Sequence, residues 1–288
     1  MTDTESINIK NNERIKKEIR TLNLTSDFFL SVALEDMEAC EYVLKILMDD
    51  NSLKVIQTKS QYSIRQIGTH SVVLDILAED STGKIYEIEM QTGDNPGHIR
   101  RVRYITSSID TSFLDKGNDY TKLPELHIFY ITTFDIANAH KTVYDIIRID
   151  SETHIEFDNG VHEHYINTIV NDGSTISDLM HYFNNTDSSN INYGALSKRV
   201  KYLKESKGGN SYMCEFIEKI QQESHDIGRL EGLREGRREG QLEGGIQTLI
   251  IDNLEDGKSK DIIIMKLEKR FGLSPEDAEY NYNKCLNK

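Results

Sequence analysis

The pattern of apolar and polar residues predicts a β-hairpin in the first third of the chain. Residues 72–78 and 85–91 are apolar and rich in branched side chains, and residues 79–84 between them are mostly polar and include a glycine. Two such runs around a short turn are typical of paired antiparallel strands. Successive side chains of a strand point to opposite faces, so polar groups at every second position of the second run gather on one face.

The polar face of this hairpin carries Glu87, Glu89 and Gln91. Folding about the turn places Asp75 opposite Ile88 or Glu89, depending on the turn type. Facing residues have Cβ atoms roughly 4.5–5.5 Å apart, so two carboxylates there repel each other unless a cation lies between them. Mg²⁺ suits such a pair because it binds one or two carboxylates together with water and phosphate oxygens. The alternative is a solvent-exposed acidic hairpin, although an Asp among apolar neighbours seldom lacks a partner.

Helical and extended patterns surround the hairpin. Apolar residues spaced three and four apart predict amphipathic helices at 36–48 and 99–113, and apolar runs predict strands at 53–57 and 125–133. The order through residue 133 is therefore helix, three strands, helix, strand. Farther along we expect a strand from Tyr144, a second hairpin made by 154–157 and 161–166, and helices at 176–183 and 195–203.

An ordered series of short segments carries a family resemblance. The segments are 26–29, 74–80, 83–91, 101–104, 109–110, 116–120, 123–124, 128–131 and 134–135. In this order they resemble the PD-(D/E)XK nuclease family transposases, also called the Rpn recombination-promoting nucleases. The likeness covers most of residues 24–215. It implies an α/β fold with a restriction-endonuclease-like core, an αβββαβ mixed sheet flanked by helices, followed by a helical C-terminal extension.

The resemblance also implies an activity, a metal-dependent DNA endonuclease of the recombination-promoting, transposase-like type that uses Mg²⁺ or Mn²⁺. Asp75 and Glu89 are then the metal ligands, Gln91 positions the attacking water or the phosphate, and Glu87 supports the site. Lys is common at the third position in the wider superfamily, whereas Gln91 can form hydrogen bonds but adds no full charge. A nuclease-fold interaction protein that does not cleave and assembles through its C-terminal repeat therefore stays open as an alternative.

DNA as the substrate calls for basic groups, and the predicted helix at 99–113 carries Arg100, Arg101 and Arg103. These arginines lie off its apolar face, where they either contact DNA phosphates or solvate the helix. The formal net charge of −14 opposes binding to nucleic acid. Charge acts locally, however, and bound divalent ions invert the sign of a carboxylate cluster. We expect DNA binding that needs metal and falls steeply with salt.

Composition narrows the class of protein. The 288 residues are 37% hydrophobic and 28% charged with three prolines, which is typical of a soluble globular chain. No window approaches the roughly 20 apolar residues of a membrane span, and the polar start lacks the apolar core of a signal peptide, so we expect a cytoplasmic protein. We expect a polar N-terminal segment at 1–23, a nuclease-like domain at 24–215 and a helical region at 216–288.

Metal-ligating residues outside the hairpin give a weaker signal. Cys40, Cys214 and Cys285 lie far apart and not at metal spacing from histidine, which supports neither a disulfide framework nor a zinc site. His162 and His164 share one strand face. Two histidines without a carboxylate third ligand are usually surface groups, so a metal pair there is the less favoured interpretation.

Residues 229–244 repeat every four positions as Arg-Leu-Glu-Gly, Leu-Arg-Glu-Gly, Arg-Arg-Glu-Gly and Gln-Leu-Glu-Gly, with Gly228 in register. In a helix the glycines form one ridge, and each costs about 1 kcal/mol relative to Ala. Such a helix needs a partner, so self-association through 228–245 is one interpretation and a flexible, partly helical linker is the other. Beyond the repeat, the pattern predicts a small two-helix tail without a basic DNA-reading face.

Overall fold

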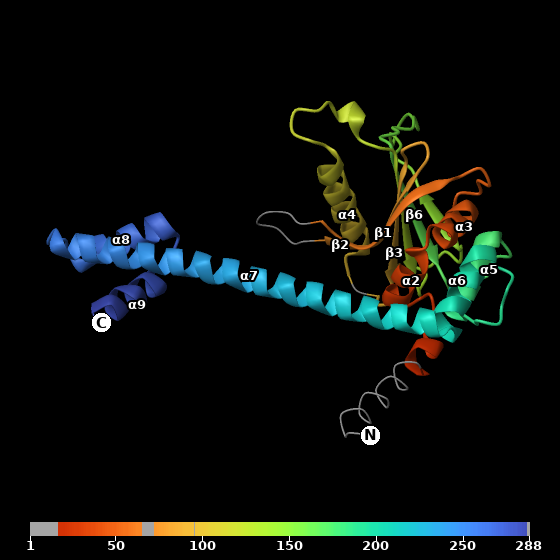
Figure 1. Cartoon of the computed structure of the whole chain (residues 1–288). Helices are drawn as coiled ribbons and strands as arrows, with labels where there is room; N and C mark the ends of the chain where they lie inside the picture. Colours follow the sequence, from red (N-terminus) through yellow and green to blue (C-terminus); the bar gives the residue numbers. More distant parts are fainter. Residues whose placement is uncertain (1–16, 65–71, 95, 287–288) are drawn as a thin grey trace, which may run out of the picture. The chain divides into compact units, whose positions relative to one another are not determined.

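The structure, a computed structural model of the chain, describes residues 17–64, 72–94 and 96–286 (Figure 1). Most of the predicted polar segment at 1–23 lies outside these residues. The chain divides into two compact units, Met1–Phe216 and Ile217–Lys288. The first unit holds the whole β-sheet, and the second is helical.

The first unit is built on a six-stranded mixed sheet with the order β1-β2-β3-β4-β6-β5. Its first three strands are antiparallel, β3, β4 and β6 run parallel, and β5 pairs antiparallel with β6 at the edge. Together with the helices around it, this sheet confirms the predicted α/β class and the αβββαβ order. The strands are β1 (Val55–Ile64), β2 (Val72–Asp80), β3 (Ile85–Gln91), β4 (Leu126–Thr132), β5 (Val143–Ile146) and β6 (Val161–Asn167).

Helices cover both faces of the sheet, with α4 on one side and α2, α3, α5 and α6 on the other (Figure 1). Apolar side chains of α4, among them Val102, Ile105 and Ile109, pack with strand residues in one buried core. A short 3-10 turn, η1 (Tyr120–Lys122), precedes β4. The helices are α2 (Asp27–Leu34), α3 (Met37–Leu47), α4 (His98–Phe113), α5 (Thr175–Asn184) and α6 (Gly194–Glu205).

The β2–β3 hairpin forms where the sequence predicts it, because its turn is fixed by one side chain. Oδ1 of Asp80 accepts hydrogen bonds from the backbone nitrogens of Thr82, at 2.8 Å, and Lys84, at 3.0 Å. Gly83 has a φ of 87°, a conformation that side chains disfavour. The resulting register pairs Ile76 with Ile88. Asp75 and Glu89 are the next residues along the two strands.

Strand β1 is longer than predicted, because it continues through the polar residues after position 57 to Ile64. It forms the edge of the sheet and pairs with β2 along its length, so one of its faces tolerates polar side chains. Gln61 has a φ of 47° and is unpaired between the pairs Ser60–Ile76 and Tyr62–Leu74, and the register is the same on both sides of it. The side chain of Gln61 contacts Asp75.

The predicted hairpin of 154–157 with 161–166 is wrong. Strand β6 pairs with β4 on one edge and with β5 on the other, so neither edge is free for residues 154–157. That segment forms no strand and makes one isolated bridge, between Ile149 and Glu156. Its apolar side chains Ile155 and Phe157 remain exposed. The long-range parallel pairing of β6 with β4 therefore forms in place of the hairpin that the local pattern predicts.

The glycine repeat is part of one continuous helix, α7 (Lys207–Glu255), of 49 residues. The flexible, partly helical linker is therefore not what the structure shows. In the second unit, α8 (Lys260–Phe271) and α9 (Pro275–Leu286) pack on the end of α7, as a two-helix tail. Their shared core includes Ile250, Ile263 and Leu267.

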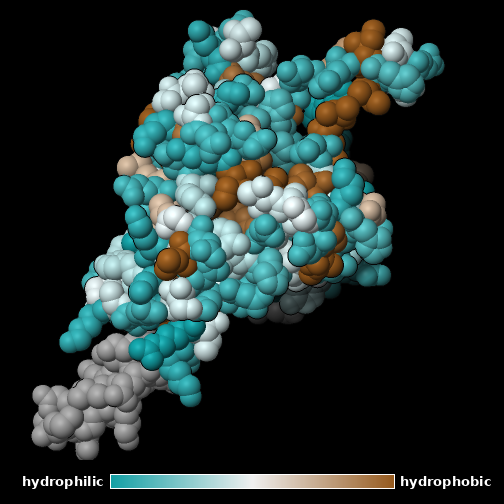
Figure 2. Space-filling model, turned by 90° about the vertical axis from the view of Figure 1, so that its right-hand side faces the viewer, coloured by the Kyte–Doolittle hydropathy of each residue, from teal (hydrophilic) through white to brown (hydrophobic). Residues whose placement is uncertain are grey.

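Among the described residues, no helix has both the length and the apolar character that a bilayer crossing requires. On the face of the molecule drawn in Figure 2, hydrophilic side chains predominate and separate the hydrophobic patches from one another.

Candidate active site

Several of the sequence-predicted residues meet at one cavity of about 520 Å³ near the C-terminal end of β3. Asp75 reaches it from β2, Glu89 and Gln91 from β3, and Arg101 from the first turns of α4. Asp27, the first residue of α2, and the N-cap residue Ser26 also line the cavity. The cavity therefore collects acidic groups from three elements that are far apart in the chain.

Asp75 is held in place on both of its carboxylate oxygens. Oδ2 accepts a hydrogen bond of 2.9 Å from the backbone nitrogen of Met90, and Oδ1 accepts one of 3.2 Å from Nε2 of Gln61. Only 8% of the residue is exposed. Burial, followed by the charge of Glu89, raises the pKa of Asp75 to about 8. A proton therefore occupies Asp75 at neutral pH unless a cation replaces it.

Glu89 has one positively charged neighbour among the described residues, the guanidinium of Arg101. Its Oε1 accepts hydrogen bonds from Nε of Arg101, at 2.9 Å, and from Nη2 of the same guanidinium. Its Oε2 is buried and has no hydrogen-bond partner in the part of the chain that the structure describes. Because Glu89 is almost wholly buried while half of the Arg101 side chain is exposed, the arginine is the partner that can withdraw.

Glu87 lies behind Glu89 on the same face of β3 and does not line the cavity. It is fully buried, and neither carboxylate oxygen accepts a hydrogen bond from a described residue. Burial and the charges of Glu89 and Asp75 raise the pKa of Glu87 well above its usual range. Glu87 therefore favours its protonated form beside the charge of Glu89.

The remaining predicted site residues lie nearer the solvent. Nε2 of Gln91 donates a 3.1 Å hydrogen bond to the carbonyl of Gly93, and its side chain faces the cavity. Arg100 and Arg103 are exposed on α4 and do not line this cavity. Arg101 is set apart from them, since it is paired with Glu89. Contacts of Arg100 and Arg103 with DNA phosphates remain predictions.

Two residues beside Asp75, Gln61 and Asp27, were not predicted from the sequence as site residues. Gln61 contacts Asp75 directly from β1, but its position depends on a left-handed backbone that no local pattern announces. Asp27 adds its charge to those that raise the pKa of Asp75. Asp27 could have been predicted as a site residue, because it belongs to the short segment 26–29 that carries the family resemblance.

The donor set fits a divalent cation. Asp75, Glu87 and Glu89 bring three buried carboxyl groups together, and among the described residues Arg101 is the cation bonded to one of them, Glu89. One oxygen of Glu89 has no partner there, and two of the acids have raised pKa values. A cation at Asp75 and Glu89 would complete this charge balance, and Mg²⁺ needs no more than two protein carboxylates.

Comparison with known proteins gives one match. Residues 40–173 match a family whose description is PD-(D/E)XK nuclease family transposase. The matched segment contains the entire sheet and α4, and with them Asp75, Glu87, Glu89 and Arg101. No curated protein and no solved structure matches the chain. The resemblance inferred from the sequence is therefore confirmed by this match to the PD-(D/E)XK nuclease family transposases over residues 40–173.

Proposed function

We propose that this protein is a metal-dependent DNA endonuclease in which Asp75 and Glu89 hold a divalent ion, Mg²⁺ or Mn²⁺. The observation that carries the proposal is the convergence of these two buried carboxylates on one cavity with Arg101 as counter-charge. The family match over residues 40–173 supports a nuclease or transposase-like activity on DNA. A role in DNA recombination is part of the proposal.

The bound ion would polarise the scissile phosphate and lower the pKa of the attacking water. Gln91, at the mouth of the cavity, positions that water or a phosphate oxygen through its amide. Glu87, buried behind Glu89 on the same face of β3, supports the site as a protonated acid that adds no further negative charge. Each of these roles uses the side chain in the position where the fold holds it.

We propose that Arg101 alternates between two partners, Glu89 and a DNA phosphate. Without an ion its guanidinium neutralises Glu89, and with DNA present its fork geometry suits a phosphate. Arg100 and Arg103 extend this basic surface along α4, where phosphate contacts position the DNA without reading its sequence. Because the formal net charge is −14, binding should depend on these few groups and weaken steeply with salt.

Cleavage of supercoiled plasmid in Mg²⁺ or Mn²⁺ tests the proposal. Asp75→Ala and Glu89→Gln should each lower the rate of metal-dependent nicking at least 100-fold while the circular dichroism spectrum stays that of the parent. Glu79→Gln is the matched control, because Glu79 is a carboxylate of β2 at the far end of the hairpin. Wild-type nicking by the Asp75→Ala variant would reject the assignment.

The second candidate function is that of an interaction protein that retains the nuclease fold without cleaving. It draws on α7, where an added Cβ at each of the five repeat glycines would meet no atom within 4 Å, so the ridge is open. On this proposal the chain forms a homo-oligomer through 228–245. Metal titration separates the two functions, because an active site should bind Mn²⁺ and lose that binding in Glu89→Gln, whereas a scaffold should not bind it.

A further inference from the structure

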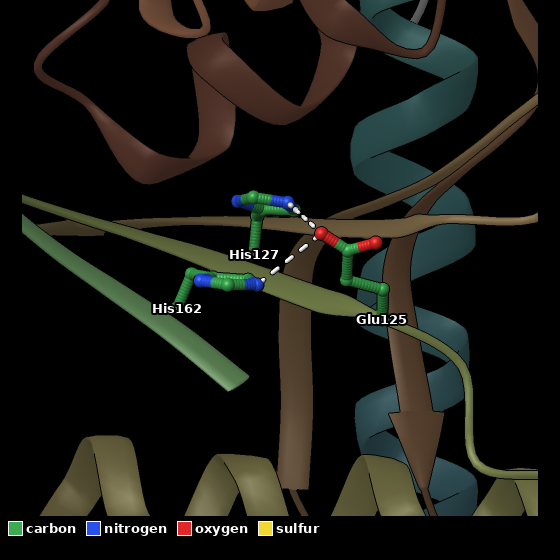
Figure 3. A group of neighbouring side chains, drawn as sticks. All are labelled: Glu125, His127 and His162. Atoms are coloured by element: carbon green, nitrogen blue, oxygen red, sulfur yellow. Dashed lines mark ion pairs between the residues drawn. The ribbon is translucent and has the colours of Figure 1, made fainter. Parts of the chain in front are cut away.

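A second group of metal-ligating side chains lies at the other end of the parallel strands from the cavity of Asp75 and Glu89. Glu125 directly precedes β4, and His127 is the second residue of that strand. His162 is the second residue of β6, and the parallel register places it beside His127. The three side chains point toward one another from these neighbouring strands (Figure 3).

The ligand atoms converge on one carboxylate oxygen. Nε2 of His162 lies 3.2 Å from Oε1 of Glu125, and Nε2 of His127 lies 3.5 Å from the same oxygen. Ligands held about 2.1 Å from a tetrahedral zinc ion are about 3.4 Å from one another. The imidazoles are stacked with ring centroids 4.4 Å apart, so His162, which is one-third exposed, must tilt to share an ion with His127.

A relay of side chains leaves the lone pair of His127 facing Glu125. Asp145 accepts a 2.6 Å hydrogen bond from Nδ1 of His164. With an uncharged His164, its Nε2 accepts from Nδ1 of His127 over 3.2 Å, and Nε2 of His127 is then an acceptor. This nitrogen is buried without a hydrogen-bond partner among the described residues, and its side chain is 7% exposed. Two acceptors that face each other inside a protein mark a position for a cation.

The protonation states suit metal binding. Burial, with smaller contributions from His162 and His164, lowers the pKa of His127 to about 4. A hydrogen bond from Lys84 is the largest of the causes that lower the pKa of Glu125. At neutral pH the imidazole of His127 is therefore uncharged and the carboxylate ionised, as metal ligands must be.

Lys84 must move away from Glu125 when a metal ion binds there. Its Nζ lies 3.0 Å from Oε1 of Glu125, the oxygen that both histidines face. The Lys84 side chain is 35% exposed and can turn outward into the solvent. Its contact with Glu125 supplies positive charge to the cluster when no ion is present, much as Arg101 does for Glu89.

We propose that Glu125, His127 and His162 form a zinc site separate from the nuclease cavity. Two imidazole nitrogens and one carboxylate are a ligand set of zinc, with a fourth position for water, whereas Mg²⁺ and Ca²⁺ prefer oxygen ligands alone. The carboxylate–imidazole relay from Asp145 through His164 would orient His127, the role such partners play for metal-bound histidines. A zinc ion here ties the start of β4 to that of β6.

Zinc binding to the full-length, untagged chain after chelator treatment tests the site. We expect one Zn²⁺ per chain by calorimetry, and a tetrahedral absorption spectrum when Co²⁺ is used as the probe. Glu125→Gln and His162→Ala should each weaken Zn²⁺ binding at least 100-fold. Both side chains are about one-third or more exposed, so thermal unfolding in the absence of metal should change little.

Two control variants distinguish this zinc site from adventitious binding at surface histidines and from binding in the nuclease cavity. His154→Ala removes an exposed histidine outside the cluster and should leave Zn²⁺ affinity unchanged. Asp75→Asn alters the nuclease cavity and should also leave it unchanged, whatever its effect on nicking. Wild-type Zn²⁺ affinity in both Glu125→Gln and His162→Ala would overturn the proposal, as would loss of the zinc site in Asp75→Asn.

Discussion

Arg101 directs two of its nitrogens at one oxygen of Glu89. Nε and Nη2 both donate to Oε1, the first over 2.9 Å, and Oε2 is left buried without a partner among the described residues. The arginine is half exposed, whereas the glutamate is 2% exposed. The guanidinium therefore acts as a removable counter-charge at a site whose acid is fixed.

Replacing Arg101 by Gln should destabilise the metal-free protein and increase its response to metal. Loss of the guanidinium leaves Glu89 buried and unpaired, and because Arg101 is half exposed we expect a loss of about 1–2 kcal/mol in the free energy of unfolding. Saturating Mn²⁺ should restore this loss, so the metal-induced rise in Tm should exceed that of the parent. Arg103→Gln, an exposed arginine of the same helix, should change neither quantity. An equal Mn²⁺ response in Arg101→Gln and the parent would contradict the assignment of Arg101.

Glu87→Gln should stabilise the metal-free protein at pH 8 and have little effect at pH 5. The amide keeps the shape of a protonated glutamic acid and can donate to Glu89 without having to hold a proton. We expect an increase of about 1 kcal/mol in the free energy of unfolding at pH 8, the order of one buried polar group. Urea unfolding at the two pH values measures the difference. A variant less stable than the parent at pH 8 would show that Glu87 is ionised.

Metal affinity should rise with pH until about pH 8 and then level off. The pKa of Asp75 is about 8 in the folded protein, so below that value an ion must displace a proton and affinity changes by up to tenfold per pH unit. Titration with Mn²⁺ between pH 6 and pH 9 measures this slope. Asp75→Asn should bind Mn²⁺ more weakly and with a flatter pH dependence.

The same proton affects the stability of the metal-free protein. The folded pKa of Asp75 lies above its unfolded value of about 3.9, so the folded state holds the proton more tightly. Its stabilising contribution is complete below about pH 4 and is lost as the pH rises toward 8. The midpoint of urea unfolding without metal should fall over this range in the parent and change less in Asp75→Asn.

Alanine in place of Gly232, Gly236 and Gly240 tests the open ridge of α7. An added Cβ meets no atom within 4 Å at these positions, so each alanine should stabilise the helix by up to about 1 kcal/mol. If two chains pack through the ridge, the added methyl groups separate them. We therefore expect higher helicity by circular dichroism together with a weaker oligomer by light scattering. Gln241→Ala is the control, and an oligomer unchanged in the triple variant would show that the ridge is not an interface.

Local pattern was sufficient for the elements whose partners are close in the chain. The β2–β3 hairpin follows from two apolar runs around Asp80 to Lys84, whose backbone the Asp80 side chain organises. Helices α3 and α4 follow from apolar residues that face the core, such as Val43 and Val102. In these cases periodicity, turn chemistry and burial point to the same structure.

The second metal-ligating group was hidden because its members come from different strands. His127 and His162 are neighbours through a parallel pairing across 35 positions, and nothing in either local sequence announces that pairing. The sequence instead drew attention to His162 with His164, for which no third ligand was evident. The structure gives His164 a supporting contact to His127 and supplies Glu125 as the carboxylate.

The parallel registers of β3, β4 and β6 also fix the distance between the cavity of Glu89 and the histidine cluster of His127 and His162. Along β4, three residues separate His127 from Tyr130, which pairs with Glu89 of β3, and this is roughly 10 Å at the usual rise. One end offers mainly oxygen donors, which suit chemically hard ions, and the other offers mainly nitrogen, which suits borderline ones. One sheet can therefore bind two kinds of cation at separate sites. The metal ions that co-purify with the protein would show which of the two sites is occupied.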